Sequence, residues 1–373
     1  MAHRRHSLEE PTSPPDYVFL GALLCVVIFG FVVLASASSD IAQLRFGDSY
    51  YYLKRQALNG LGLGLPGFLL GFFFLYRRLR PLAIFLLFAS VGATLLVFTP
   101  LGVSVKGATR WLDLGFFSFQ PAELLKLTFP LYVASWTGTN VRRGTSFFEG
   151  FVPFLILMGF VAGILLLQPS TTTAAIILVA AVFVYFASGA RFHFFPLLGA
   201  SAILAFALLI ALAPYRMERI RTFLNPEEAD PLGEGYHVGQ SQTAIGSGGL
   251  WGVGYGRSTT KLRYLPEPIG DSIFAVIAEE LGFVGASSLL FLFFVIIYRG
   301  FMIARHAPEP FARLLVIGFI SVIGIQTFIN VGAVSGVFPL TGVPLPFVSF
   351  GGTSLAVFLI MAGVIMNVSR YRR

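Results

Sequence analysis

Long apolar runs alternate with short polar connections along nearly the whole chain. A helix needs about 20 mostly apolar residues to cross the hydrocarbon core of a bilayer, and ten runs approach that length. The pattern therefore predicts an all-α integral membrane protein with about ten transmembrane helices. The predicted spans are Tyr17–Ala37, Leu58–Leu75, Leu82–Phe98, Pro121–Thr137, Phe151–Leu167, Thr172–Ala187, Phe194–Ala213, Ser272–Tyr298, Phe311–Val334 and Val348–Val368.

One polar connection is much longer than the others. Segment 214–271, between the seventh and eighth predicted helices, is rich in glycine, basic residues and carboxylates. A loop of this length in a compact fold is usually functional or disordered. We expect a disordered tail at 1–16 and a single polytopic membrane domain at 17–373, with this large loop as the first place to look for chemistry.

The arginines between the runs predict the orientation. Short basic loops favour the cytoplasmic side of a membrane, and alternate connections are basic, as are both ends of the chain. Both termini are then cytoplasmic and the large loop is extracytoplasmic. The arginines on the predicted cytoplasmic side are Arg4, Arg5, Arg77, Arg78, Arg80, Arg142, Arg143, Arg191, Arg299, Arg305, Arg313, Arg370, Arg372 and Arg373.

Composition agrees with a membrane protein. The chain is 56% hydrophobic and 12% charged, with mean hydropathy +0.80, whereas soluble domains are about 25% charged. The net charge of +8 comes largely from arginines in the turns, so it does not indicate nucleic acid as a partner. Cys25 is the single cysteine, which excludes an intrachain disulfide.

The first run also has a competing interpretation. Ala35-Ser36-Ala37 resembles a signal-peptidase site after an apolar run with basic residues in front of it. The run is nevertheless long enough to span, and acidic residues, among them Asp16, lie in front of it. We therefore favour a retained first helix.

Two predicted spans carry acidic residues, and ionisable residues are costly in a membrane and are candidates for function. Glu123 and Lys126 are three residues apart, so they share a helix face. A self-neutralising ion pair is the alternative to a site. Glu279 and Glu280 lie about two turns beyond Asp271, roughly 12 Å deeper at about 1.5 Å per residue. We expect one of them to face a polar cavity or pair with a cation.

The stretch before the fourth span is too polar and glycine-rich to cross a membrane. It contains Lys106, Arg110, Asp113 and Gln120, and we expect it to dip into the outer leaflet, shielded by protein. Together with Lys126, its cations suit an anionic headgroup such as a phosphate or pyrophosphate. Ordinary charge in an outer loop is the alternative.

Asp271 ends the large loop. Aspartate is a favoured helix N-cap, so a cap and a catalytic carboxylate are both open, and one does not exclude the other. Arg219 and Lys261 are further cations of this loop. Its stretch AIGSGGLWGVGYG lacks the Lys-Ser/Thr ending of a P-loop, and predicts either a close backbone approach or a plain turn. The proline-rich segment before the last span predicts an ordered outer loop.

Together these motifs resemble the SEDS family of peptidoglycan polymerases (shape, elongation, division and sporulation proteins). The division branch, FtsW, is the most similar, and the elongation branch, RodA, is a close alternative. Two sites in the sequence depart from the family pattern: Ser170 stands where an acid is typical, and the pair Ile269-Gly270 stands where His-Thr is typical. The matching stretches are KGATRWLDLGFFSFQPAELLKL, YRMERIRTFLNPEEADPLGEGYHVGQSQTAIGSGGLWGVGYG, KLRYLPEPIGDSIFAVIAEELGFVG and PLPFVSFGGTS.

The resemblance implies an inverting glycosyltransferase that polymerises lipid II at the outer face of the bacterial cytoplasmic membrane. Asp271 matches the family's essential acid and would act as general base on the acceptor 4-hydroxyl, with undecaprenyl pyrophosphate leaving. No cofactor is certain, although the pyrophosphate suits a divalent cation, Mg²⁺ or Mn²⁺. The substrate-binding candidates are Lys126, Arg110, Lys106, Glu123, Gln120, Arg219, Lys261 and Glu280.

The resemblance also implies partners, namely a class B penicillin-binding protein acting as transpeptidase and the division proteins. Two other classes of function stay open at this point. A carrier or flippase for the same lipid would also use intramembrane charge, but it often has repeated halves, and no repeat is visible here. A pure scaffold would tolerate the loss of Asp271.

Overall fold

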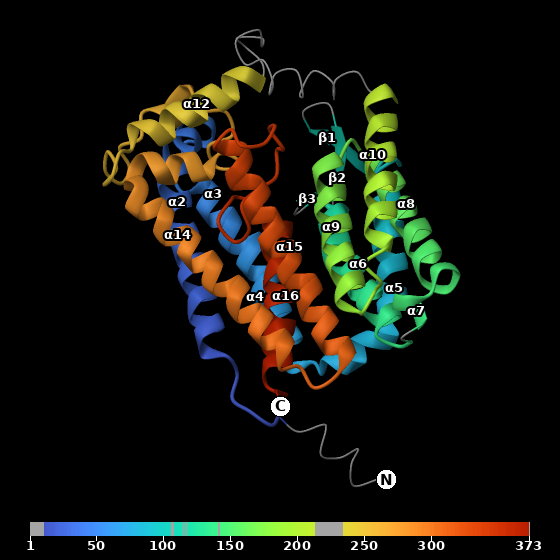
Figure 1. Ribbon diagram of the computed structural model, residues 1–373. Helices are drawn as coiled ribbons and strands as arrows, with labels where there is room; N and C mark the ends of the chain where they lie inside the picture. Colours follow the sequence, from blue (N-terminus) through green and yellow to red (C-terminus); the bar gives the residue numbers. More distant parts are fainter. Residues whose placement is uncertain are drawn as a thin grey trace.

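The computed structural model describes residues 11–105, 108–113, 115, 118–140, 142–212 and 234–372. Figure 1 shows a bundle of helices with their long axes roughly aligned. The C-terminus lies at one end of the bundle, and the strands and α12 lie at the other end. Seven of the described helices are long and apolar enough to cross a membrane, which agrees with a multi-pass membrane protein.

A helix occurs at each of the ten predicted spans. Seven of these helices meet the length and hydropathy of a membrane span. Helices α6 and α9 and the part of α10 up to Leu204 do not, so the count of ten membrane spans stays a prediction. The helices are α2 (Tyr17–Phe46), α3 (Tyr51–Arg55) continuing through η1 (Gln56–Leu61) into α4 (Gly62–Phe73), α5 (Tyr76–Leu96), α6 (Pro121–Thr137), η2 (Phe147–Phe151) with α8 (Val152–Leu167), α9 (Thr171–Ala187), α10 (Phe194–Leu212), α14 (Ile273–Arg305), α15 (Pro310–Val334) and α16 (Gly352–Ser369). Short helices α7 (Arg142–Thr145), α12 (Glu234–Ser247) and α13 (Thr260–Arg263) lie in the connections.

Helix α16 lies in the core and packs against α4. Gly64, Gly67 and Gly71 of α4 face it so closely that a Cβ at Gly67 would lie 2.5 Å from Ile360 Cγ1. Small residues of this kind let membrane helices approach each other closely, which replaces the hydrophobic driving force that lipid cannot supply. The predicted start of this helix at Val348 was wrong, because it begins at Gly352, after an irregular segment.

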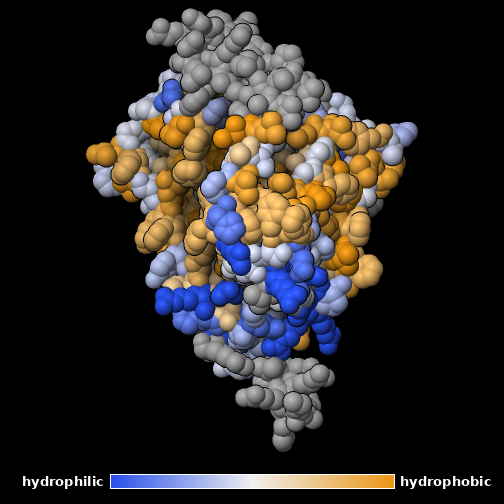
Figure 2. All heavy atoms as spheres, turned by 45° about the vertical axis from the view of Figure 1, so that its right-hand side comes forward, coloured by the Kyte–Doolittle hydropathy of each residue, from blue (hydrophilic) through white to orange (hydrophobic). Residues whose placement is uncertain are grey.

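The two ends of the described chain are tied together. Asp16 is the N-cap of α2 and accepts from Phe19 N, and its carboxylate also pairs with Arg299 and Arg372, each at 2.6 Å. Burial alone would raise the pKa of Asp16, but hydrogen bonds from Arg299, Phe19 and Arg372 outweigh it and hold the pKa below its ordinary value. Figure 2 shows hydrophilic residues gathered toward the lower end of the molecule and an apolar belt above them.

The polar stretch before α6 forms a small sheet, and its expected place in the outer leaflet stays a prediction. Strands β1 (Gly102–Val105), β2 (Ala108–Asp113) and β3 (Ser118–Phe119) pair antiparallel in that order, with Leu112 opposite both Gly102 and Phe119. The protein is therefore mostly helical rather than purely so. The sheet satisfies backbone groups that an irregular segment would have left unpaired.

Helix α14 contains a sharp kink at Gly282, which adopts a φ of 67°. The glycine-rich stretch of the large loop packs against this kink: Val253 N donates to Glu279 O at 2.9 Å, and Phe283 N donates to Gly249 O at 2.9 Å. A Cβ at Gly252 would lie 2.2 Å from Glu280 O. The expected close backbone approach is thus confirmed, and the surface it approaches is the chain's own helix.

Candidate active site

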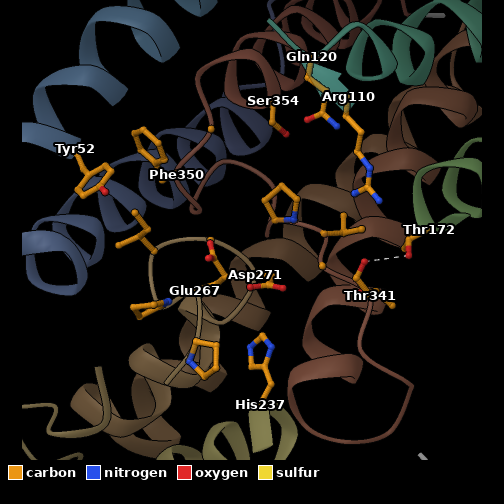
Figure 3. Close-up of a pocket in the computed structure, with 18 of the residues that line it drawn as sticks. Tyr52, Arg110, Gln120, Thr172, His237, Glu267, Asp271, Thr341, Phe350 and Ser354 are labelled. Carbon is orange, nitrogen blue, oxygen red and sulfur yellow. Dashed lines mark hydrogen bonds between the residues drawn. The ribbon is translucent and has the colours of Figure 1, made fainter. Parts of the chain in front are cut away.

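A cavity of about 940 Å³ collects most of the residues that the sequence analysis singled out. Its walls come from α2, α3, β2, the first turns of α6 and α9, α12, α13, and the loops before α14 and α16. Figure 3 shows that these residues come from segments far apart in the sequence and point toward one space.

Asp271 lines this cavity, one residue before the N-cap of α14. The cap is Ser272, so the interpretation of Asp271 as the cap was wrong. Figure 3 shows Glu267 and His237 on the same side of the cavity as Asp271. The Nε2 atom of His237 lies 2.5 Å from Ser272 Oγ, which brings α12 against the start of α14. The backbone oxygen of Asp271 accepts a 2.8 Å hydrogen bond from Asn330 Nδ2.

The ion pair predicted from helical spacing is confirmed. Lys126 Nζ lies 2.6 Å from Glu123 Oε1, and both side chains are buried although both line the cavity. Lys126 Nζ also donates to Gln326 Oε1 at 2.8 Å. The second carboxylate oxygen of Glu123 has no hydrogen-bond partner among the described residues. The pair therefore leaves one buried carboxylate oxygen of Glu123 open to a further donor, while the Lys126 ammonium is held by Glu123 and Gln326.

Two arginines add positive charge to the cavity wall. Arg110 of β2 donates from Nε to Gln168 O at 3.1 Å and from a terminal nitrogen to Pro169 O at 2.5 Å, which fixes the sheet against the start of α9. Arg45, in the last turn of α2, is exposed and also lines the cavity. Together with Lys126 they supply the cationic surface that an anionic headgroup requires.

Lys261 lies at the edge of the same cavity in a second buried ion pair. Its Nζ atom is 2.6 Å from Glu280 Oε1 and 3.0 Å from Ser36 Oγ. The expectation that one glutamate of α14 pairs with a cation is thus confirmed. Among the described residues the cavity wall includes Lys261 but not Glu280, so Glu280 is the buried partner of a lysine that lines the cavity. Glu279 instead accepts from Ser258 Oγ at 2.5 Å.

The remaining predicted residues divide into two groups. Gln120 lines the cavity as the residue just before α6. Lys106 and Arg219 lie outside the described residues, so their placement stays a prediction. Within the described part of the chain, no group of three His, Cys, Asp or Glu side chains could hold a metal ion.

Sequence reasoning missed Arg45, His237 and Glu267. The first helix was expected to end at Ala37, but it continues to Phe46 and so carries Arg45 in its last turn. A prediction that extended this helix beyond Ala37 would have indicated Arg45. His237 and Glu267 lie in the large loop among many polar residues, where nothing in the local pattern distinguishes them. The positions at 170–173, where Ser170 replaces a family acid, also line the cavity with hydroxyl groups.

Comparison with known proteins finds relatives that match almost the whole chain. A family model described as "Cell cycle protein", for FtsW, RodA and SpoVE, matches residues 16–373. The chain is 38% identical to stage V sporulation protein E of Bacillus subtilis, over 96% of this chain and 98% of that protein. It is 37% identical to a probable peptidoglycan glycosyltransferase FtsW of Trichlorobacter lovleyi, over 95% of this chain and 93% of that protein.

Solved structures show the same fold. A chain from a study titled "Structural coordination of polymerization and crosslinking by a peptidoglycan synthase complex" is 33% identical, with a TM-score of 0.80 over 95% of this chain and 98% of that one. The rod shape determining protein RodA of Thermus thermophilus is 30% identical, with a TM-score of 0.71 over 96% of this chain and 97% of that one. Matches of this extent in sequence and structure show that the chain belongs to the FtsW, RodA and SpoVE family, the SEDS proteins.

Proposed function

We propose that this protein is a peptidoglycan glycosyltransferase that polymerises lipid II, with Asp271 as its general base. Relatives along almost the whole chain carry the name peptidoglycan glycosyltransferase. The observation that carries the proposal is the arrangement of the cavity, in which carboxylates, Asp271 among them, and several cations line one space. A sugar hydroxyl that must lose a proton and a pyrophosphate that must be stabilised need these two kinds of group.

The reaction begins at the acceptor 4-hydroxyl. Asp271 takes the hydroxyl proton while the oxygen attacks the donor's anomeric carbon, and the bond from that carbon to the pyrophosphate oxygen breaks with its electrons. The new linkage is β, because attack occurs opposite the leaving group. A positioned base of this kind contributes roughly 10²–10⁴-fold to the rate.

The leaving undecaprenyl pyrophosphate gains negative charge that Lys126, Arg110 and Arg45 would stabilise. Fixed cations in a site partly closed to water are effective at such stabilisation, because they need no reorganisation as the charge develops. Glu123 would hold the Lys126 ammonium in place. We derive no step through Mg²⁺ or Mn²⁺, and a requirement for either is tested by adding a chelator to the assay.

The setting of this activity follows from the family. We propose that the cavity opens at the outer face of the bacterial cytoplasmic membrane, with both termini in the cytoplasm. A solved relative belongs to a peptidoglycan synthase complex that coordinates polymerisation with crosslinking, which supports a class B penicillin-binding protein as partner. Relatives named FtsW support a role in division together with division proteins.

The decisive experiment feeds labelled lipid II to the purified protein with its cognate partner. Wild type should form glycan chains, and Asp271→Asn should form none while keeping its melting temperature and partner binding. Glu267→Gln tests the other carboxylate on the same wall, and Asp48→Asn, an exposed carboxylate paired with Lys54 at 2.8 Å, is the control.

Equal polymerisation by wild type and Asp271→Asn would show that Asp271 is not the general base. Loss of polymerisation in Glu267→Gln alone would assign the role of base to Glu267. No product from folded, partner-bound wild type, with divalent cations present, would favour a carrier. That class is then tested by lipid II translocation in vesicles.

A further inference from the structure

Two buried amides of α15 lie behind the cavity and were not indicated by the sequence. Gln326 and Asn330 are four residues apart, so they share a helix face, and both are at most 1% exposed. Neither amide is needed by the helix backbone. Buried amides are costly unless they are hydrogen-bonded, so the partners of these two show what they do.

Each amide joins one side of the cavity to the loop before α16. Gln326 accepts from Lys126 Nζ at 2.8 Å and donates to Pro344 O at 2.8 Å. Asn330 donates to Asp271 O at 2.8 Å and to Val343 O at 2.7 Å. Because the partners are an ammonium and three carbonyl oxygens, only one orientation of each amide satisfies them.

These contacts form one path across the back of the cavity. It runs from Lys126 through Gln326 to Pro344, and from the adjacent Val343 through Asn330 to the backbone of Asp271. Other bonds hold the same loop. Ser349 Oγ donates to Gly270 O at 2.6 Å, and Thr172 Oγ1 donates to Thr341 O at 3.1 Å, the contact drawn dashed in Figure 3.

We propose that Gln326 and Asn330 are positioning residues that fix Asp271 relative to the Lys126 ammonium, with residues 343–344 as the bridge. This inference rests on the proposed function, in which Asp271 takes the proton and Lys126 stabilises the pyrophosphate. A purely structural role of the amides predicts only a loss of stability when they are replaced, because the backbone carbonyls that they bind would be left unpaired. Catalysis requires the amides, because a displacement of about 1 Å can reduce the rate about 10²-fold.

The two residues should differ in their kinetic effects. Asn330→Leu releases Asp271 from the loop and should lower kcat about 10- to 100-fold with little change in KM. Gln326→Met removes one hydrogen bond of the Lys126 ammonium and leaves the ion pair with Glu123, so it should also raise KM for lipid II. Because both residues hold the same bridge, the double variant should lose no more kcat than the more damaged single variant.

The experiment combines steady-state kinetics with hydrogen exchange on the full chain and its partner. Thr327→Val is the matched control, because Thr327 is buried between the two amides and its hydroxyl bonds within its own helix, to Ile323 O at 2.8 Å. Asn330→Leu should speed amide exchange in peptides covering 269–272 and 341–345. Thr327→Val should change neither exchange nor kcat.

Unchanged exchange in Asn330→Leu would overturn the inference, whether or not wild type polymerises lipid II. Faster exchange with an unchanged kcat would also overturn it, as would losses in the two single variants that multiply in the double variant. A wild type that shows the protected segments but forms no glycan would instead overturn the proposed function.

Discussion

Removing the buried ion pair of α6 one partner at a time, and then both together, separates its structural role from its chemical role. The variants are Glu123→Met, Lys126→Met and the double replacement. Lys126 Nζ and Glu123 Oε1 are 2.6 Å apart, and the two side chains are 0% and 3% exposed. Either single change leaves the other charge buried with no opposite charge in contact among the described residues.

The magnitude follows from that burial. Breaking a buried pair by removing one partner costs about 3–5 kcal/mol, whereas replacing both partners by apolar groups is often neutral or stabilising. We expect Glu123→Met to lower the melting temperature by roughly 5–10 °C. The double variant should recover most of this loss, apart from about 1–3 kcal/mol for Gln326 Oε1, which loses its donor.

Activity should not recover with stability. The double variant lacks the Lys126 ammonium, so it should stay inactive in lipid II polymerisation although it unfolds near the wild-type temperature. Thermal unfolding in detergent and a gel assay of glycan products measure the two properties on the same preparation. Polymerisation at wild-type rate by the double variant would refute the assignment of Lys126 to the pyrophosphate and leave the pair as self-neutralising charge.

Three further changes test other parts of the structure. Gly282→Ala should lower the free energy of unfolding by more than about 2 kcal/mol, because the residue has a left-handed φ and its Cβ would lie 2.3 Å from the nitrogen of Gly252. Gly163→Ala is the control, because the space around Gly163 is open. In thermal unfolding it should be neutral or stabilising by up to about 1 kcal/mol. The pKa of Asp16 is lowered in the folded protein, so the stability that this carboxylate contributes is complete above its ordinary pKa of 3.8 and is lost as the pH falls through its folded pKa. The difference in melting temperature between wild type and Asp16→Asn should therefore shrink as the pH is lowered below 3.8. A difference that stays constant with pH would contradict this. Arg45→Gln should raise KM for lipid II about 10- to 100-fold, because it removes one charge-assisted hydrogen bond, which is worth about 1.5–3 kcal/mol. The unfolding temperature should not change. An unchanged KM would show that Arg45 does not bind the substrate.

Local patterns predicted those parts of the structure that depend on local periodicity. The helices follow the apolar runs, and the contact between Glu123 and Lys126 follows from their helical spacing. A close backbone approach by the glycine-rich stretch was one of the two predictions made from its glycines, the other being a plain turn. The helix that this stretch approaches was not predictable, because the kink at Gly282 depends on a segment some 30 residues away finding the freed backbone groups.

Contacts between spans were beyond such reasoning. Gln326 and Asn330 are uncharged residues inside an apolar run, and their spacing fixes a shared face without showing what that face meets. The ion pair of Lys261 and Glu280 required the large loop to fold back on α14. In each case the information lies in the packing of separate segments, which a single sequence does not display.

The close packing of α4 on α16 also constrains how the protein is made. Chains emerge from the ribosome N-terminus first, and earlier parts begin to fold before later parts exist. The glycine face of α4, at Gly64, Gly67 and Gly71, must therefore wait until α16 has been made. This part of the bundle interior is completed late in synthesis, so loss of α16 would leave α4 without the helix on which its glycine face packs.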